Sequence, residues 1–122
     1  MNLLGLAKKK IDRSCNVKSF RHAAIAFLPN GHILATEANR KGNGDISDFS
    51  MHAEEMLAKK LMRMHVKERI GRFTVLVARY RKADNSWAMS LPCLPCQGWF
   101  WEAGCDTIQY TGNDGKIRKL GS

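Results

Sequence analysis

The segment that most constrains the fold is residues 73–80, FTVLVARY, which is apolar at nearly every position. This run predicts a β-strand covered on both faces, because a strand with one solvated face alternates apolar and polar residues. Helices are therefore expected on both sides of the sheet that contains this strand.

The first third of the chain predicts a helix and a β-hairpin. Residues 3–13 have an apolar stripe interrupted by a lysine run, which is typical of a surface helix. Residues 22–28 and 32–38 predict two strands, and the Asn-Gly pair between them favours a tight turn.

A second helix is predicted to begin after Ser50, a favourable N-cap residue. It follows residues 39–49, which are rich in Gly, Asn and Asp and predict a loop. The helix is expected to end at Gly71. Its apolar side chains share one helical stripe: Ala53, Met56, Leu57, Leu61 and Met64.

A third helix is predicted in the last part of the chain, with Ser90 as its N-cap and Pro92 in its first turn. It runs to about Ala103, and Gly104 stands where a helix stop belongs. Residues 105–111 predict a last strand, followed by a turn and a basic tail.

These elements predict a single domain over residues 1–122 with an α/β fold. We expect three layers, α/β/α, around a central mixed sheet of about five strands. The strands joined through the third helix should be parallel, in a right-handed crossover. The two helix N-termini, at Ser50 and Ser90, are then expected near the same end of the sheet.

No apolar run approaches the roughly 20 residues needed to span a bilayer, and the basic run after the apolar start does not resemble an export signal. We therefore expect a cytoplasmic protein with reduced cysteines and no membrane partner. In that compartment the Cys93–Cys96 pair indicates a metal or redox site. Cys15 and Cys105 are expected to be small apolar fillers.

The formal net charge is +9, and its largest share lies in residues 1–21, which net +5. A basic surface attracts polyanions and phosphorylated small molecules alike, and it can also serve only to keep a protein solvated. The charge therefore leaves a nucleotide and a single-stranded nucleic acid open as partners.

The two predicted helix N-termini carry the residues with chemical potential. Cys93 and Cys96 open one helix, and their thiols should point the same way, with the helix dipole favouring the thiolate form. His52 opens the other. One imidazole and two thiolates are the ligand set of a catalytic Zn²⁺ site that keeps a fourth position for water.

Glu54 lies two residues after His52, where its carboxylate can stand beside the open metal position without ligating. There it can take a proton from water and deliver it to a substrate nitrogen. His-x-Glu followed by Pro-Cys-x-x-Cys is the signature of the zinc-dependent nucleobase deaminases. The chain resembles the cytidine and deoxycytidylate deaminase superfamily, and in particular the small CMP/dCMP-type members of phages and microbes.

The resemblance implies a cytidine-deaminase-like fold and a set of substrate contacts. Asn39 corresponds to an asparagine that holds the sugar, and the backbone of Ala53 to a group that holds the pyrimidine. Leu91 stands where many members have Ser or Glu before the Pro-Cys pair. Trp87, on the segment leading to the cysteines, is a candidate wall of the substrate pocket.

The implied activity is hydrolytic deamination of cytosine to uracil in a nucleoside or nucleotide: cytidine, deoxycytidine, CMP or dCMP. A deaminase of single-stranded DNA or RNA is one alternative, and a non-catalytic, zinc-stabilised nucleic-acid-binding module is another. Trp99, Phe100 and Trp101 cannot all enter one core, so one tryptophan is expected to pack against a second subunit or to lie half exposed. A homo-oligomer is also expected.

Overall fold

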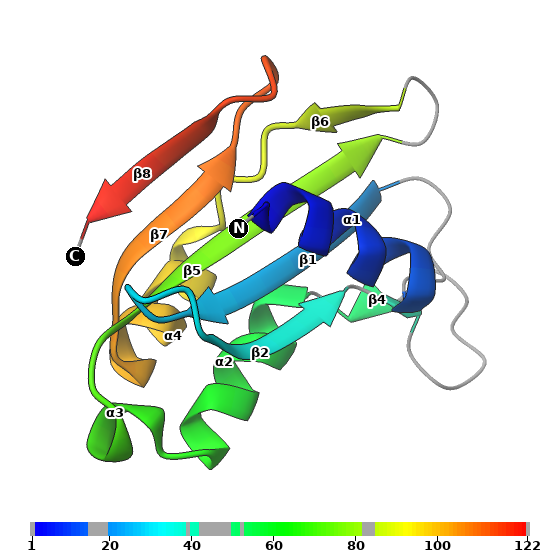
Figure 1. Ribbon diagram of the computed structural model, residues 1–122. Helices are drawn as coiled ribbons and strands as arrows, with labels where there is room; N and C mark the ends of the chain where they lie inside the picture. The colour runs from blue at the N-terminus through cyan, green and yellow to red at the C-terminus, as the bar shows by residue number, and fades with distance from the viewer. Residues whose placement is uncertain are drawn as a thin grey trace.

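The computed structural model describes residues 2–14, 20–38, 40–41, 50–51, 53–81 and 85–121. Its main sheet consists of β1 (Phe20–Phe27), β2 (Ile33–Ala38), β5 (Phe73–Arg81), β6 (Ser86–Ala88), β7 (Cys105–Thr111) and β8 (Ile117–Gly121). The strand order is β2-β1-β5-β7-β8, with β6 paired to β5 outside this path (Figure 1). Only the β5–β7 pair is parallel within this six-stranded sheet.

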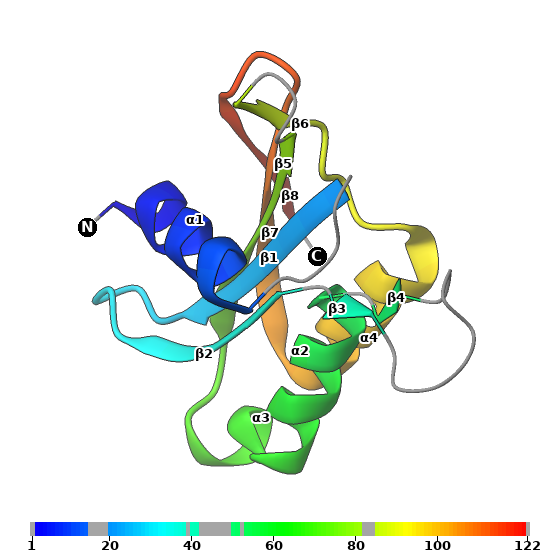
Figure 2. The ribbon, with the colours of Figure 1, turned by 90° about the vertical axis from the view of Figure 1, so that its right-hand side faces the viewer.

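Strand β5 lies at the centre, and Val75, Leu76, Val77 and Ala78 are all 0% exposed. One face of the sheet is covered by α1 (Leu3–Ser14), and the other by α2 (Ala53–Arg63) and α4 (Leu94–Ala103), as Figure 2 shows. Ile11 and Ile25 are buried in the core on the α1 side, and Leu57 and Phe100 in the core on the α2–α4 side. The three-layer α/β/α prediction is confirmed.

The hairpin of β1 and β2 is also confirmed, and its turn shows why Asn-Gly stands there. The N–H of Gly31 donates to the carbonyl of Leu28 at 2.8 Å, and Gly31 has a φ of 90°. The side chain of Asn30 accepts the N–H of His32 at 2.9 Å. The positive φ is accessible to glycine because it has no Cβ.

The crossover from β5 to β7 runs through α4, and the two strands are parallel as expected. The helix ends at Gly104, which has a φ of 108° and whose N–H bonds back to the carbonyls of Phe100 and Trp101. Its start differs from the prediction, since α4 begins at Leu94 with Cys93 as N-cap and with Pro95, not Pro92, in the first turn.

Both ends of the second helix differ from the prediction. Ser50 is not an N-cap, because it lies in β4 (Ser50–Met51), which pairs with β3 (Arg40–Lys41). The helix breaks after Arg63, and α3 (Val66–Arg69) follows as a separate short helix. His65 adopts a φ of 54° at the break, which turns the chain so that Val66 is buried at 1% exposure. Met64, predicted on the buried stripe, is 38% exposed.

Strand β8 was predicted only as a basic tail. It pairs antiparallel with β7 through the turn at residues 112–115, where the N–H of Gly112 bonds to the carbonyl of Lys116 at 2.9 Å. Most of its side chains are exposed, including Arg118 and Lys119. Charged side chains on an edge strand oppose pairing with other chains.

Within the described ranges, none of the helices has the length and apolar character required to cross a bilayer.

Two glycines, Gly98 inside α4 and Gly104 at its end, allow a test of where this helix ends. Gly98 is exposed inside α4, and a Cβ there would meet no atom within 4 Å. At Gly104 a Cβ would lie 3.0 Å from Cβ of Lys67, and the φ is 108°. We expect Gly98→Ala to raise the free energy of unfolding by about 0.5–1 kcal/mol. Gly104→Ala should lower it by about 1–3 kcal/mol. Urea unfolding measures both, and equal effects of the two substitutions would contradict the assigned helix end.

Candidate active site

The first turns of α2 and α4 meet on the face of the sheet opposite α1. The two helices pack against each other, and α2 also packs on β1 and β2 (Figure 2). The chain runs back along β5 as β6, and Ser90 bonds to the carbonyl of Val77 in the middle of β5 shortly before α4 begins. The predicted meeting of two helix N-termini is confirmed in this form, with the starts at Ala53 and Leu94 and not at Ser50 and Ser90.

Cys93 and Cys96 are held by the start of α4. Cys93 is the extended N-cap residue, and its carbonyl accepts the N–H of Gln97 at 3.0 Å. The side-chain amide of Gln97 reaches back and donates to the carbonyl of Pro92 at 2.8 Å. Cys93 is exposed and Cys96 is 7% exposed, so the pair has one sulfur at the surface and one beneath it.

Glu54 lies in the first turn of α2 and is 7% exposed. Its charge acts on the cysteine pair. The pKa of the Cys96 thiol is raised to about 12, first by burial, then by a hydrogen bond with Cys93 and by the negative charge of Glu54. The structure thus brings Glu54, Cys93 and Cys96 together, from segments about forty residues apart in the sequence.

The direction of this pKa shift corrects one expectation. The dipole of α4 was expected to favour the thiolate, but the pKa of Cys96 is raised, first by burial, then by the hydrogen bond with Cys93 and the charge of Glu54. Every cause raises the pKa of Cys96, so ionisation of this thiol would place a further negative charge close to Glu54 and Cys93. Two sulfur donors beside a carboxylate fit a dication with high affinity for sulfur, such as Zn²⁺.

The other predicted ligand, His52, lies outside the described residues, next to the first residue of α2. Among the residues that are described, no three metal-ligating side chains gather in one group. The ligand set of His52, Cys93 and Cys96 therefore stays a prediction, with two of its three members placed.

A buried network of hydrogen bonds fixes the segment before the cysteines, and no local sequence pattern indicates it. The hydroxyl of Ser90 donates to the carbonyl of Val77 in β5 at 2.6 Å and accepts the N–H of Thr111 in β7 at 2.8 Å. The hydroxyl of Thr111 donates to the carbonyl of Ala88 at 2.6 Å. Ser90 is thus a clamp between two strands and not the helix cap that was predicted. We call Ser90 and Thr111 the hydroxyl knot.

The two residues of the hydroxyl knot and Glu54 are polar side chains that are buried in the core. Within the described residues, the buried polar side chains are Glu54, Ser90 and Thr111. All three lie in or directly behind the meeting point of α2 and α4. Buried polar groups are costly unless they are satisfied, and their concentration here makes this region the candidate functional site.

The structure describes three of the four predicted substrate contacts. Ala53 is fully buried as the first residue of α2, where backbone N–H groups lack partners within the helix. Leu91 is 48% exposed, two residues before Cys93. Asn39 lies outside the described residues. Trp87 packs edge-to-face on Tyr80 within the cluster on the α1 face, so we leave it out of the proposed site.

Two further cysteines and two tryptophans lie outside the candidate site or outside the described residues. Cys105 is 4% exposed, and burial raises its thiol pKa to about 12, as expected of an apolar filler. Trp99 and Trp101 are both half-buried at the edge of the α2–α4 core. Cys15 lies outside the described residues.

Solved structures of cytidine deaminases share this architecture. The enzyme from Burkholderia pseudomallei superposes with a TM-score of 0.67 at 17% identity, over 98% of this chain and 89% of that one. The enzyme from Mycobacterium leprae gives 0.60 at 16% identity, over 98% and 93%. The enzyme from Mycobacterium tuberculosis gives 0.58 at 18% identity, over 94% and 85%.

These likenesses extend over nearly the whole chain. No family model matches the sequence, and no curated protein matches it. At identities of 16–18% the superpositions establish the fold, so the chain has the cytidine deaminase-like fold. The fold expected from the resemblance is confirmed.

The hydroxyl knot can be tested by a double-mutant cycle. Ser90→Ala leaves the buried N–H of Thr111 without its 2.8 Å acceptor, and should lower the free energy of unfolding by about 1–3 kcal/mol. Combining it with Thr111→Val should reveal a coupling of about 0.5–3 kcal/mol, because both changes remove the same network. Thr107→Val, at a half-buried position of the same strand, is the control and should change stability by about 0.5 kcal/mol or less. Additive effects of the two knot substitutions would show that the hydroxyls act separately.

Proposed function

We propose that this protein is a zinc-dependent hydrolytic deaminase that converts cytosine to uracil in a nucleoside or nucleotide. The observation that carries the proposal is the burial of Glu54 beside the Cys93–Cys96 pair, where two helices begin, in a chain with the cytidine deaminase-like fold. Similar structures are described as cytidine deaminases.

The metal would be held by His52, Cys93 and Cys96. Bound Zn²⁺ supplies a water of lowered pKa, so that attack is possible near neutral pH. Residues of the chain perform all the other steps. The hydroxyl knot fixes the segment that carries Cys93, and Gln97 holds the turn between the two sulfurs. The thiols are thereby preorganised, which a tight metal site requires.

Glu54 is proposed to move the protons. It accepts a proton from the attacking water and delivers it to the ring nitrogen next to the carbon that carries the amine. The new C–O bond forms at that carbon, and the C–N bond then breaks. A second proton passes through Glu54 to the departing amine, so the products are uracil and ammonia. Its position favours this role, because Glu54 is buried in the first turn of α2 beside Cys93 and Cys96.

The substrate would lie between the two helix starts. We propose that the backbone at Ala53 contacts the pyrimidine, that Asn39 contacts the sugar, and that the exposed side chain of Leu91 borders the opening. Leu91 offers an apolar surface and no hydrogen bond, which distinguishes it from Ser or Glu at the same position. The net charge of +9 favours a phosphorylated substrate, and a single-stranded nucleic acid remains the second candidate.

The proposed catalyst can be tested with neighbouring carboxylates. Zinc-loaded protein is offered cytidine, deoxycytidine, CMP, dCMP and a cytosine-containing single strand, and ammonia release is measured. Glu54→Gln should lower the rate by about 10²–10⁴-fold, because it removes the proton carrier and preserves the side-chain volume. Glu55→Gln is the matched control: Glu55 lies one residue on in α2, is half-buried and pairs with Lys59 at 2.9 Å.

Two results of this assay would decide against the proposal. Ammonia release that survives Glu54→Gln would overturn the assigned mechanism. Salt-sensitive binding to the single strand, without ammonia release from any substrate, would identify a non-catalytic binding module instead.

The ligand set can be tested by metal content. Cys93→Ser and Cys96→Ser should each lower bound zinc to well below one equivalent per chain, as measured by elemental analysis after dialysis. Cys105→Ser is the control, because its thiol bonds to the carbonyl of Thr107 at 3.1 Å, away from α2, and it should retain the metal. His52→Ala should resemble the first two variants. Full zinc retention in either the Cys93 or the Cys96 variant would remove that residue from the ligand set.

A further inference from the structure

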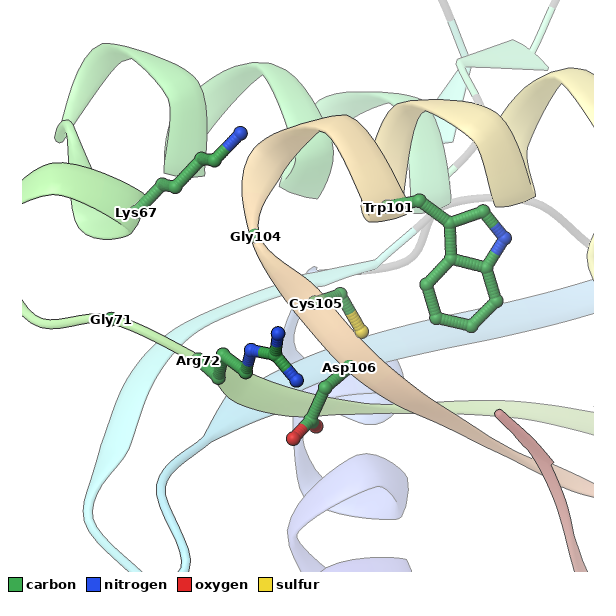
Figure 3. Close-up of a pocket in the computed structure, with 7 residues that line it drawn as sticks. All are labelled: Lys67, Gly71, Arg72, Trp101, Gly104, Cys105 and Asp106. Carbon is green, nitrogen blue, oxygen red and sulfur yellow. The ribbon is translucent and has the colours of Figure 1, made fainter. Parts of the chain in front are cut away.

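A second pocket lies at the opposite end of α4 from Cys93. It has a volume of about 390 Å³. It is lined by residues of α3, of the connection from α3 to β5, and of the passage from α4 into β7: Lys67, Gly71, Arg72, Trp101, Gly104, Cys105 and Asp106 (Figure 3). Since α4 has 10 residues, its two ends are about 15 Å apart. This pocket is therefore separate from the candidate active site.

Three of the residues that line the pocket lie where the backbone is irregular. Gly71 has a φ of 107°, and a Cβ on it would meet nothing within 4 Å, so the chain leaves open space there. Gly104 ends α4 with a φ of 108°. In β7, Asp106 is an extra residue: Cys105 pairs with Phe73 and Thr107 with Thr74, which makes a β-bulge at Asp106. Bulges redirect side chains and are frequent beside functional sites.

The charges in the pocket are not neutralised by one another. Lys67 and Arg72 are exposed cations and Asp106 is half-buried. The ion pairs found in the described part of the chain include none of these three side chains. Figure 3 shows the guanidinium of Arg72 and the carboxylate of Asp106 on the same side of the pocket, with Lys67 above them.

Lys67 is also prepositioned. A Cβ at Gly104 would lie 3.0 Å from Cβ and 3.2 Å from Cγ of Lys67, so the lysine stem rests directly on the helix end where only glycine fits. Packing of the stem limits the rotamers of the side chain and reduces the entropy lost when its ammonium group binds an anion. A surface lysine without such packing would lose more side-chain entropy on binding an anion.

We propose that this pocket binds a small hydroxylated phosphate monoester, of the sugar-phosphate class. The guanidinium of Arg72 and the ammonium of Lys67 suit the phosphate, for which Arg offers a bidentate fork. The Asp106 carboxylate accepts hydrogen bonds from hydroxyl groups, and the indole of Trp101 supplies an apolar wall. A volume of about 390 Å³ is near the lower end of the range of roughly 300–1,000 Å³ for small-molecule sites, so the ligand is small.

The first test is isothermal titration calorimetry of the full chain with D-ribose 5-phosphate, inorganic phosphate and D-ribose as probes. Ribose 5-phosphate should bind, inorganic phosphate should bind at least about tenfold more weakly, and ribose should give no heat. Absence of binding by ribose 5-phosphate would overturn the proposal. Equal binding of inorganic phosphate would also overturn it, because it would show a general attraction for anions only.

Variants then locate the ligand. Lys67→Met and Arg72→Gln should each weaken ribose 5-phosphate by about tenfold or more, and Asp106→Asn should weaken it without changing phosphate binding. Lys119→Met is the control, since it removes one positive charge from the exposed edge strand β8, and it should leave the affinity within about twofold. Equal losses in the control and in Lys67→Met would contradict a specific site. Thermal unfolding without ligand checks that each variant is folded.

This proposal does not depend on the deaminase activity. Glu54→Gln should bind ribose 5-phosphate as the unmodified protein does, because Glu54 lies at the other end of the helix pair. Loss of binding in this variant would place the ligand in the active site and overturn the second pocket. Lys67→Met and Arg72→Gln should in turn keep the rate of ammonia release found for the unmodified protein.

Discussion

The rest of the structure depends on the burial of β5 from both sides. Val75 to Ala78 are fully buried, so helices must cover both faces of the sheet. On one face α1 is sufficient. On the other face α2 and α4 together cover the sheet, and they pack against each other. Because both run back along the strands that they precede, their first turns fall together. The candidate active site thus follows from the need to cover one strand.

Much of this could be predicted from the sequence, because the signals were local. The continuous apolar run of β5, the apolar stripe of α1, the Asn-Gly turn and the glycine after α4 each depend on a few adjacent residues. The element order then fixed the layers and the parallel pair. His52, Glu54, Cys93 and Cys96 could be proposed because short spacings at helix starts carry chemistry, and the structure places the last three together.

The parts that were missed depend on contacts between distant residues. Ser90 was predicted as a cap because serine near a helix start usually caps it, but Thr111 lies 21 residues further on and captures its hydroxyl. The break at His65 arises because Val66 reaches the core only if the helix stops there. The pocket at the far end of α4 depends on a bulge at Asp106, and the register of two strands is not visible in either strand alone.

The distribution of buried polar groups links the fold to its proposed chemistry. In the described residues the core is otherwise apolar, and the buried polar side chains are Glu54, Ser90 and Thr111. Ser90 and Thr111 satisfy each other and three backbone carbonyls or amides, so their burial costs little. Glu54 differs from them because it carries a carboxyl group beside the Cys93–Cys96 pair, where its negative charge contributes to the raised pKa of the Cys96 thiol. A chain that only needed a stable core would place an apolar residue at position 54, since local rules of folding are broken chiefly where function requires it. A buried carboxyl group at position 54 therefore agrees with the chemical role that the proposed mechanism gives it.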